Sequence, residues 1–169
     1  MFCPKFNHCS VTSWIPSPIK LKPAIATIAR LFDLGLKPYV VATALEGIIA
    51  QRLVRQVCPV CREEAPVDTP LRDRLGPVFA NVTRVHRGKG CPACHGSGYK
   101  GRVGLYEVLT LDDDLRDRIG GGASILEIRR AVRQKGLHSI AHHAAERVMA
   151  GATSLEEILR VLGPQAGEE

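Results

Sequence analysis

Four of the six cysteines fall into two Cys-Pro-x-Cys pairs, and their spacing carries the clearest chemical signal in the chain. The pairs are Cys58-Pro59-Val60-Cys61 and Cys91-Pro92-Ala93-Cys94. Each pair can place two thiolates on one side of a tight turn, and two such turns supply the tetrahedral sulfur set that Zn²⁺ prefers. Two disulfides or four free thiols are the alternatives, but paired Cys-x-x-Cys units are typical of structural zinc sites.

The residues around the two pairs fit a zinc site. Gly90, Gly96 and Gly98 flank the second pair, and glycine readily adopts the positive φ that turns backbone N–H groups toward sulfur. The negative charge of a zinc–tetrathiolate centre could be offset by Arg62, Arg87, Lys89, Lys100 and Arg102. No histidine or carboxylate position is left open to water, so the site is predicted to be structural. Its thiolates must stay reduced, which predicts a cytoplasmic location.

Composition and charge limit the class of protein. The 169 residues give room for one domain with a small subdomain. The net charge of +6 suggests a nucleic acid, a nucleotide or an anionic membrane surface as partner, although arginine-rich helix surfaces also serve solubility alone. No membrane insertion is predicted, because the most apolar stretch, Tyr39–Ala50, contains Glu46 and is too short for a bilayer. Residues 1–22 lack the features of a secretory signal.

The N-terminal third is predicted to hold an arm and two helices. Residues 1–22 are rich in proline without periodicity, and we expect a disordered arm in which Cys3 and Cys9 are free thiols. Apolar residues at helical spacing predict a helix over 23–35 and a second one over 38–55. The expected buried face of the second helix consists of Val41, Leu45, Ile48, Ile49 and Leu53.

The rest of the chain is predicted to be mostly helical. Between the cysteine pairs, Leu71–Leu75 favours a short helix and Val82–Val85 a weak strand. After the second pair, the β-branched run Val103–Leu109 predicts a strand. Capping boxes at Ser124–Glu127 and Ser154–Glu157 each open a helix. Helices are expected over 112–119, 124–135, 139–150 and 154–162. The predicted fold class is mostly α with a small β element, arranged as a zinc-knuckle subdomain and a C-terminal helical bundle.

Catalytic machinery is not evident. The chain has no GxxxxGK[ST] phosphate loop, and Gly120–Gly122 is better suited to ending a helix. Asp112–Asp114 could suggest a cation site, but consecutive carboxylates cannot all face one ion, so a solvated helix N-terminus is expected. His138 and His142 have i, i+4 spacing without a third ligand, which favours surface histidines. The chain alone is not expected to be an enzyme.

Several ordered segments together resemble the ATPases of type II secretion and type IV pilus assembly. Residues 45–61 are similar to the segment that leads into that family's tetracysteine site. Residues 90–109 are similar to the segment that leads out of it. Residues 24–55 and the tail over 151–162 match the family as well. The resemblance covers residues 23–163 and is specific because several motifs agree in order.

The resemblance implies a function that the chain alone could not carry out. The family consists of cytoplasmic ATPases, peripheral at the inner membrane, that use ATP and Mg²⁺ to drive pilus or pseudopilus assembly. They act as homo-hexamers with platform proteins of the membrane. Their Walker A, Asp box, Walker B and His box would lie before residue 23, and this chain lacks them. The chain therefore looks like a C-terminal fragment, a remnant of a RecA-like P-loop domain, from which no ATP hydrolysis is expected alone.

The family pattern also implies roles for single residues. The implied Zn²⁺ ligands are Cys58, Cys61, Cys91 and Cys94. Arg102 matches an arginine that approaches bound nucleotide, with Arg52 and Arg55 lining the same cleft, and a guanidinium suits this role because it pairs with phosphate. Neutralising the zinc-thiolate charge is the alternative role for Arg102. One departure is His142-His143, where relatives often carry an acidic residue.

The predicted organisation has five segments. They are an unmatched arm (1–22), a helical hairpin from the end of the ATPase core (23–57), the zinc subdomain (58–101), a strand with the helical bundle (102–163) and a tail (164–169). A zinc-ribbon module for nucleic acid is the alternative function, and the positive charge supports it. Nucleic acid is nevertheless the less favoured partner, because only Tyr99 and Tyr106 are available near the knuckles for stacking. A chaperone-type zinc module ranks last, since the first cysteine pair lacks that repeat's glycines.

Overall fold

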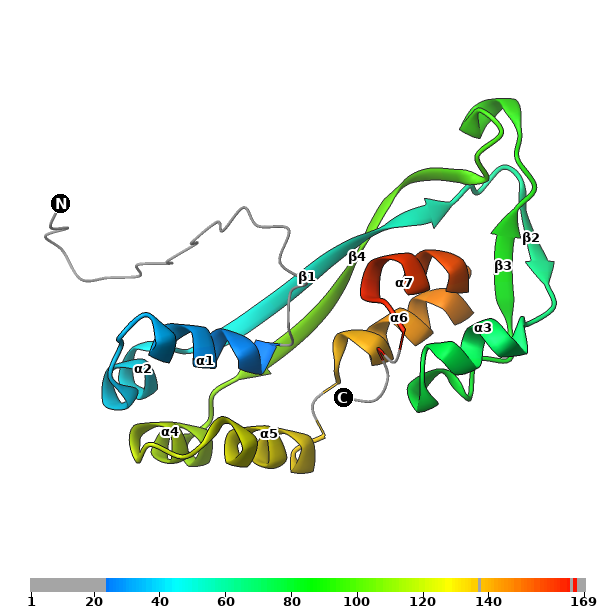
Figure 1. The fold of residues 1–169 in the computed structure, drawn as a ribbon. Helices are drawn as coiled ribbons and strands as arrows, with labels where there is room; N and C mark the ends of the chain where they lie inside the picture. The colour runs from blue at the N-terminus through cyan, green and yellow to red at the C-terminus, as the bar shows by residue number, and fades with distance from the viewer. Residues whose placement is uncertain (1–23, 137, 165, 167–169) are drawn as a thin grey trace, which may run out of the picture.

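A long two-stranded antiparallel ribbon connects the parts of the protein (Figure 1). The computed structural model describes residues 24–136, 138–164 and 166. Strand β1 (Gly47–Val57) pairs with strand β4 (Tyr99–Thr110), and the register shifts once, between Arg55 and Val57. Because the strands are antiparallel, the chain just after β1 and the chain just before β4 meet at the same end of the ribbon.

One face of the ribbon is buried and contributes to two separate apolar cores. Ile48 and Leu109 are cross-strand partners in the first core, whereas Val54 and Leu105 belong to the second. These residues share a face because side chains alternate along a strand. The ribbon therefore fixes the position of the first core relative to the second.

Four helices build the first core at the Gly47 end of the ribbon (Figure 1). They are α1 (Ala24–Asp33), α2 (Pro38–Ala44), α4 (Asp113–Gly120) and α5 (Ile125–Gln134). Local signals set their ends: Asp112 accepts the N–H of Leu115 at 3.0 Å, and the Ser124–Glu127 capping box forms as predicted. Their buried side chains include Ile25, Ile28, Val41, Leu115, Ile119, Ile128 and Val132.

The second core lies farther along the ribbon, toward the cysteines. It is built by α3 (Thr69–Arg74), the 3₁₀ turn Pro77–Phe79, strand β3 (Val85–Gly88), α6 (Ile140–Met149) and α7 (Leu155–Leu162). Strand β3 pairs with β2 (Arg62–Ala65) in a second small sheet. The segment between the cysteine pairs contributes Leu75, Phe79, Val82 and Val85 to this core. The packing of α6 and α7 therefore depends on how that segment is held.

The second predicted helix, over residues 38–55, is wrong. Helix α2 ends at Ala44, and the chain from Gly47 onward is strand β1 rather than the second half of a helical hairpin. Helical spacing placed Ile49 and Leu53 on a buried face, but these residues are 69% and 52% exposed. Glycine weakens a helix at position 47, and the β-branched residues that follow find a hydrogen-bonded partner in β4. Long-range pairing therefore outweighs the local helical period.

The remaining elements agree with the sequence except at two points. The short helix near 71–75, the strand over 103–109 and the four C-terminal helices are confirmed. The strand predicted over Val82–Val85 is wrong, because β3 begins only at Val85. Val82 is buried in a turn instead, and its backbone N–H donates to the Phe79 carbonyl. The second capping box forms only in part: Ser154 accepts the N–H of Glu157, but the Glu157 carboxylate binds arginines instead.

The described residues are thus mostly helical, with a small β element in two sheets. No helix among them is long and apolar enough to cross a membrane. The predictions for the arm over 1–22 and for the start of the first helix at Pro23 lie outside the described residues.

Helix α6 covers the outer edge of β4 through His143. The backbone N–H of Tyr106 donates to His143 Nδ1 at 2.9 Å, and Arg147 Nε lies 3.0 Å from His143 Nε2. A neutral imidazole offers one acceptor nitrogen and one N–H, so it cannot accept from both of these donors. A carboxylate could accept both, which gives a physical reason for an acidic residue at this position.

We expect His143→Glu to stabilise the protein by about 1 kcal/mol, because the carboxylate accepts from Tyr106 and Arg147 and lies in the first turn of α6. The measurement is urea denaturation at neutral pH. His143→Gln is the matched control, since glutamine has the length of glutamate but only one acceptor oxygen and no charge. An equal gain in both variants would show that the second acceptor oxygen and the charge are irrelevant.

Candidate metal centre

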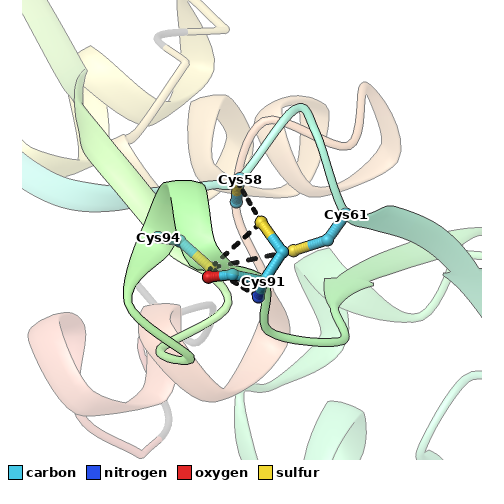
Figure 2. Close-up of side chains that lie close together, drawn as sticks. All are labelled: Cys58, Cys61, Cys91 and Cys94. Atoms are coloured by element: carbon cyan, nitrogen blue, oxygen red, sulfur yellow. Dashed lines mark hydrogen bonds between the residues drawn. The ribbon is translucent and has the colours of Figure 1, made fainter.

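The four predicted cysteines form one cluster at the end of the ribbon (Figure 2). All four Sγ atoms lie within 4.8 Å of one another. The Sγ separations are 3.9 Å for Cys58–Cys91, 3.8 Å for Cys61–Cys94 and 3.7 Å for Cys91–Cys94. Tetrahedral Zn–S bonds of about 2.3 Å place sulfurs about 3.8 Å apart. The cluster therefore has the dimensions of a four-sulfur metal site.

The ribbon explains why the two pairs meet. The first pair follows the last residue of β1, and the second brackets the 3₁₀ turn Pro92–Cys94 just before β4. The Cys58 N–H donates to the Gly98 carbonyl at 2.9 Å, and the Lys89 N–H donates to the Cys61 carbonyl at 3.1 Å, which ties the two turns together. All four cysteines are free thiols, so the disulfide alternative does not describe this arrangement.

Backbone N–H groups point at one of the sulfurs. Cys94 Sγ accepts from the N–H groups of Cys91 at 3.2 Å and Gly98 at 3.3 Å. Burial raises the pKa of the Cys94 thiol, but these donors outweigh burial and lower the pKa to about 6. Burial raises the pKa of Cys61 to about 12. A bound metal ion would remove this difference, because a coordinating thiol is deprotonated outright.

Of the two glycines that follow the second cysteine pair, Gly98 allows the two sides of the site to approach each other. A Cβ built on Gly98, whose φ is +76°, would lie 2.6 Å from the carbonyl oxygen of Gly88. Gly96 has a similar φ of +74°, but a Cβ there would meet nothing within 4 Å. The first position needs glycine for space as well as for conformation, whereas the second needs it for conformation alone.

Gly98 and Gly96 provide a matched test of the close approach. We expect Gly98→Ala to cost about 2 kcal/mol of stability and to weaken metal binding, because β3 must move away from the second turn. Gly96→Ala should cost only about 1 kcal/mol, from the left-handed backbone. The measurements are thermal unfolding and competition for metal with a chromogenic chelator. Equal effects of the two substitutions would rule out the close approach as the cause.

A second cluster of functional side chains lies where α7 meets the ribbon. A pocket of about 450 Å³ is lined by Leu53, Arg55, Arg102, Glu157 and Arg160. Arg55 donates to Glu157 through its backbone N–H at 2.9 Å and its Nε at 2.8 Å. Arg160 binds the same carboxylate at 2.6 and 2.7 Å. The pocket therefore holds three guanidinium groups and one carboxylate.

Glu157 is fully buried although it is charged. Burial raises its pKa, but the hydrogen bonds from Arg160 and from the Arg55 backbone and side chain outweigh burial and lower the pKa to about 2. The guanidinium of Arg55 also lies 4.1 Å from the centroid of the Tyr99 ring, and the Tyr99 hydroxyl lies 2.7 Å from the Ser154 hydroxyl. These contacts fix α7 against the ribbon close to the cysteine cluster.

The three arginines singled out in the sequence do not share one environment. Arg102 lies directly opposite Arg55 in the ribbon, is exposed, and has no ion pair among the described residues. Arg52 lies opposite Leu105, on the other face of the ribbon, and does not line the pocket. Sequence reasoning missed Glu157 and Arg160, because the capping box offered a local role for that glutamate. The signal for Arg160 was its position one turn after Glu157.

Most of the chain matches a known protein family. A sequence model described as type II/IV secretion system protein matches residues 17–160. The chain belongs to this family. In this secretion-family chain, the matched range contains both cysteine pairs and every residue that lines the arginine pocket.

Individual relatives carry the same family names. The type II secretion system protein E of Pseudomonas aeruginosa is 39% identical over 145 residues, covering 86% of this chain and 29% of that protein. The type IV pilus assembly ATPase PilB of Thermus thermophilus is 38% identical over 138 residues, covering 80% of this chain and 16% of that protein. The type II secretion system ATPase E of Vibrio cholerae is 34% identical over 147 residues, covering 87% and 29%. This secretion-family chain thus spans less than a third of the length of these relatives.

Proposed function

We propose that this chain acts as the C-terminal part of a type II secretion or type IV pilus assembly ATPase, the motor that powers pseudopilus or pilus assembly. In that setting it is cytoplasmic, peripheral at the inner membrane, and part of a homo-hexamer that contacts membrane platform proteins. Its first helices and its ribbon are a remnant of the RecA-like domain that binds ATP and Mg²⁺. The family match over residues 17–160 carries this proposal, together with the relatives of Thermus thermophilus and Vibrio cholerae, which are named as ATPases.

The cysteine cluster holds one structural Zn²⁺. Four cysteine sulfurs at tetrahedral spacing support zinc over harder cations, which prefer oxygen ligands. The four positions are all filled by thiols of one chain, so no ligand position is left for substrate, and the metal would stabilise the fold. Its structural effect would extend to the second core, because that core draws four side chains from the segment between the cysteine pairs.

Arg102 contacts the phosphates of the nucleotide, with Arg55 beside it. Like charges directly across an antiparallel pair are unfavourable, and the single carboxylate of Glu157 pairs with Arg55 and Arg160 but not with Arg102, so the pocket keeps a net positive charge. An anion in the pocket would relieve that repulsion, since guanidinium binds phosphate through paired donors. Arg52 lies on the other ribbon face, so the proposal rests on Arg102 and Arg55. Without a phosphate loop, the chain alone should not hydrolyse ATP.

A chimera tests this function. Residues 24–162 replace the aligned segment of the Pseudomonas aeruginosa type II secretion system protein E, and ATP turnover and zinc content are measured. We expect a zinc-loaded chimera that hydrolyses ATP and restores secretion to a strain lacking the host protein. Arg102→Ala should raise the KM for ATP, whereas Arg133→Ala, on the exposed face of α5, should not. A folded, zinc-loaded chimera that neither turns over ATP nor supports secretion would contradict the proposal.

A further inference from the structure

The charges in the arginine pocket, where α7 packs against β1, do not balance (Figure 1). The pocket is lined by Arg55, Arg102 and Arg160 but by only one carboxylate, that of Glu157. Three guanidinium groups against one carboxylate leave two positive charges in excess. Arg102 supplies one of these charges, because it has no ion pair among the described residues. The other excess charge lies within the cluster around Glu157, where one carboxylate binds two arginines.

The Glu157 carboxylate is bound by more donors than it needs. Its Oε1 accepts from the Arg55 backbone N–H at 2.9 Å and from Arg160 Nη2 at 2.6 Å. Its Oε2 accepts from Arg55 Nε at 2.8 Å and from Arg160 Nε at 2.7 Å, and Arg55 Nη2 lies a further 2.8 Å away. A carboxylate offers about four lone-pair positions. Arg55 alone contacts both oxygens, so the buried charge stays neutralised without Arg160.

Arg160 is the arginine that can leave the carboxylate with the smaller loss of contacts. The guanidinium of Arg55 lies 4.1 Å from the Tyr99 ring centroid, and the Arg55 carbonyl accepts from the Thr153 hydroxyl at 2.9 Å. Among the described residues, Arg160 binds only Glu157, and its side chain is 58% exposed. Arg55 is therefore fixed in place, whereas one carboxylate alone holds Arg160.

Strand pairing brings Arg102 beside this carboxylate. Arg55 and Arg102 are cross-strand partners, and the N–H and carbonyl of Arg55 bind Glu157 and Thr153 rather than β4. The two arginines therefore form a non-hydrogen-bonded pair, in which Cα atoms lie about 4.5 Å apart. Because Arg160 lines the same pocket, a ligand held by Arg102 also comes within the range of its long side chain.

We propose that Arg160 turns from Glu157 to a phosphate group that enters the pocket and binds it together with Arg102. Arg55 stays on Glu157, so one guanidinium neutralises the carboxylate and two face the ligand. That division of charge suits a terminal phosphate, which carries about −1.5 to −2 at neutral pH, better than a phosphodiester, which carries a single charge. The inference rests on the proposed function, in which this phosphate is the end of a nucleotide's phosphate chain, and it adds Arg160 as a ligand-binding residue.

The test is ¹⁵N NMR of the arginine side chains in the zinc-loaded chain, titrated with methyl phosphate. We expect the Nε–Hε signal of Arg160 to shift until the site is saturated, while that of Arg55 changes little. Arg160→Lys and Arg55→Lys assign the two signals. Dimethyl phosphate, which has one more methyl group and one less charge, should bind at least roughly tenfold more weakly.

A variant tests the contact itself. Arg160→Gln should weaken the binding of methyl phosphate about tenfold, because it removes paired donors to the ligand, and it should fold because Arg55 remains on Glu157. Arg133→Gln, on the exposed face of α5, is the control and should bind methyl phosphate like the wild type. An Arg160 signal that stays unchanged at saturating methyl phosphate, equal affinity for the diester, or equal weakening by both variants would overturn the proposal.

Two further measurements separate this inference from the proposed function. ATP should shift the same Arg160 signal at lower concentration than methyl phosphate, and binding no tighter than methyl phosphate would overturn the nucleotide as the source of the phosphate. A chimera that hydrolyses ATP while the Arg160 signal stays unchanged would overturn only the inference about Arg160. A phosphate-dependent shift of Arg160 in a chimera without ATP turnover would contradict only the proposed function.

Discussion

Cys58→Ser, or removal of metal by a chelator, is expected to unfold the second core while the first core survives. Zinc binding contributes on the order of 10 kcal/mol in small zinc domains, so this is the largest effect that we anticipate. The segment between the two cysteine pairs contributes Leu75, Phe79, Val82 and Val85 to the second core. No residue of that segment belongs to the first core. Helices α6 and α7 should therefore loosen, and α1, α2, α4 and α5 should remain.

The measurement is thermal unfolding by circular dichroism combined with regional hydrogen exchange. We expect amides of residues 71–88 and of α6 to lose protection, with those of α4 and α5 little changed. Cys9→Ser, which also removes one thiol but lies outside the described residues, is the control and should bind a full equivalent of zinc. Melting curves unchanged by both chelator and Cys58→Ser would contradict a stabilising metal.

Glu157→Gln is expected to cost about 3 kcal/mol at neutral pH. The substitution keeps the shape of the side chain but removes the charge that Arg55 and Arg160 share in a fully buried position. The folded-state pKa of about 2 lies below the ordinary value of 4.5, so the carboxylate adds stability at pH above about 4.5. That stability is lost progressively as pH falls from 4.5 toward 2, and a shift of this size corresponds to about 3 kcal/mol.

Urea denaturation at several pH values measures both parts of this expectation. The wild-type chain should lose stability steeply between pH 4.5 and pH 2, and Glu157→Gln should be less stable at neutral pH with a flatter dependence in that window. Glu156→Gln is the control, because Glu156 is the exposed neighbour on the same helix turn. If stability depended on pH in the same way for wild type and Glu157→Gln, the Glu157 carboxylate would not be the source of that pH dependence.

The cysteine cluster was predictable from the sequence because its information is local. Each Cys-x-x-Cys turn places its own two sulfurs, and only the meeting of the two turns needs the fold. The C-terminal helices were predictable for a similar reason, since Ser124, Ser154, Gly136 and Gly151 mark their ends within a few residues. The helix near 71–75 and the strand over 103–109 also follow from short-range patterns.

The ribbon was only half predictable, because strand β1 depends on a partner far away in the sequence. Ile48, Ile49 and Leu53 fit a helical period as well as a strand, and only pairing with β4 decides between them. The ion cluster at Glu157 was missed for the same reason: Arg55 lies 102 residues away, and the nearby Ser154 offered a sufficient local explanation. Local signals therefore fixed the knuckles and the helix ends, while long-range pairing decided the ribbon and the arginine pocket.

X-ray absorption at the zinc edge, with metal content by mass spectrometry, tests the central proposal most directly. We predict about one zinc per chain, surrounded by four sulfur atoms at about 2.3 Å and no nitrogen or oxygen ligand. Purified, reduced protein without stoichiometric zinc, or zinc bound through nitrogen or oxygen, would contradict the account of this cluster as a closed structural site.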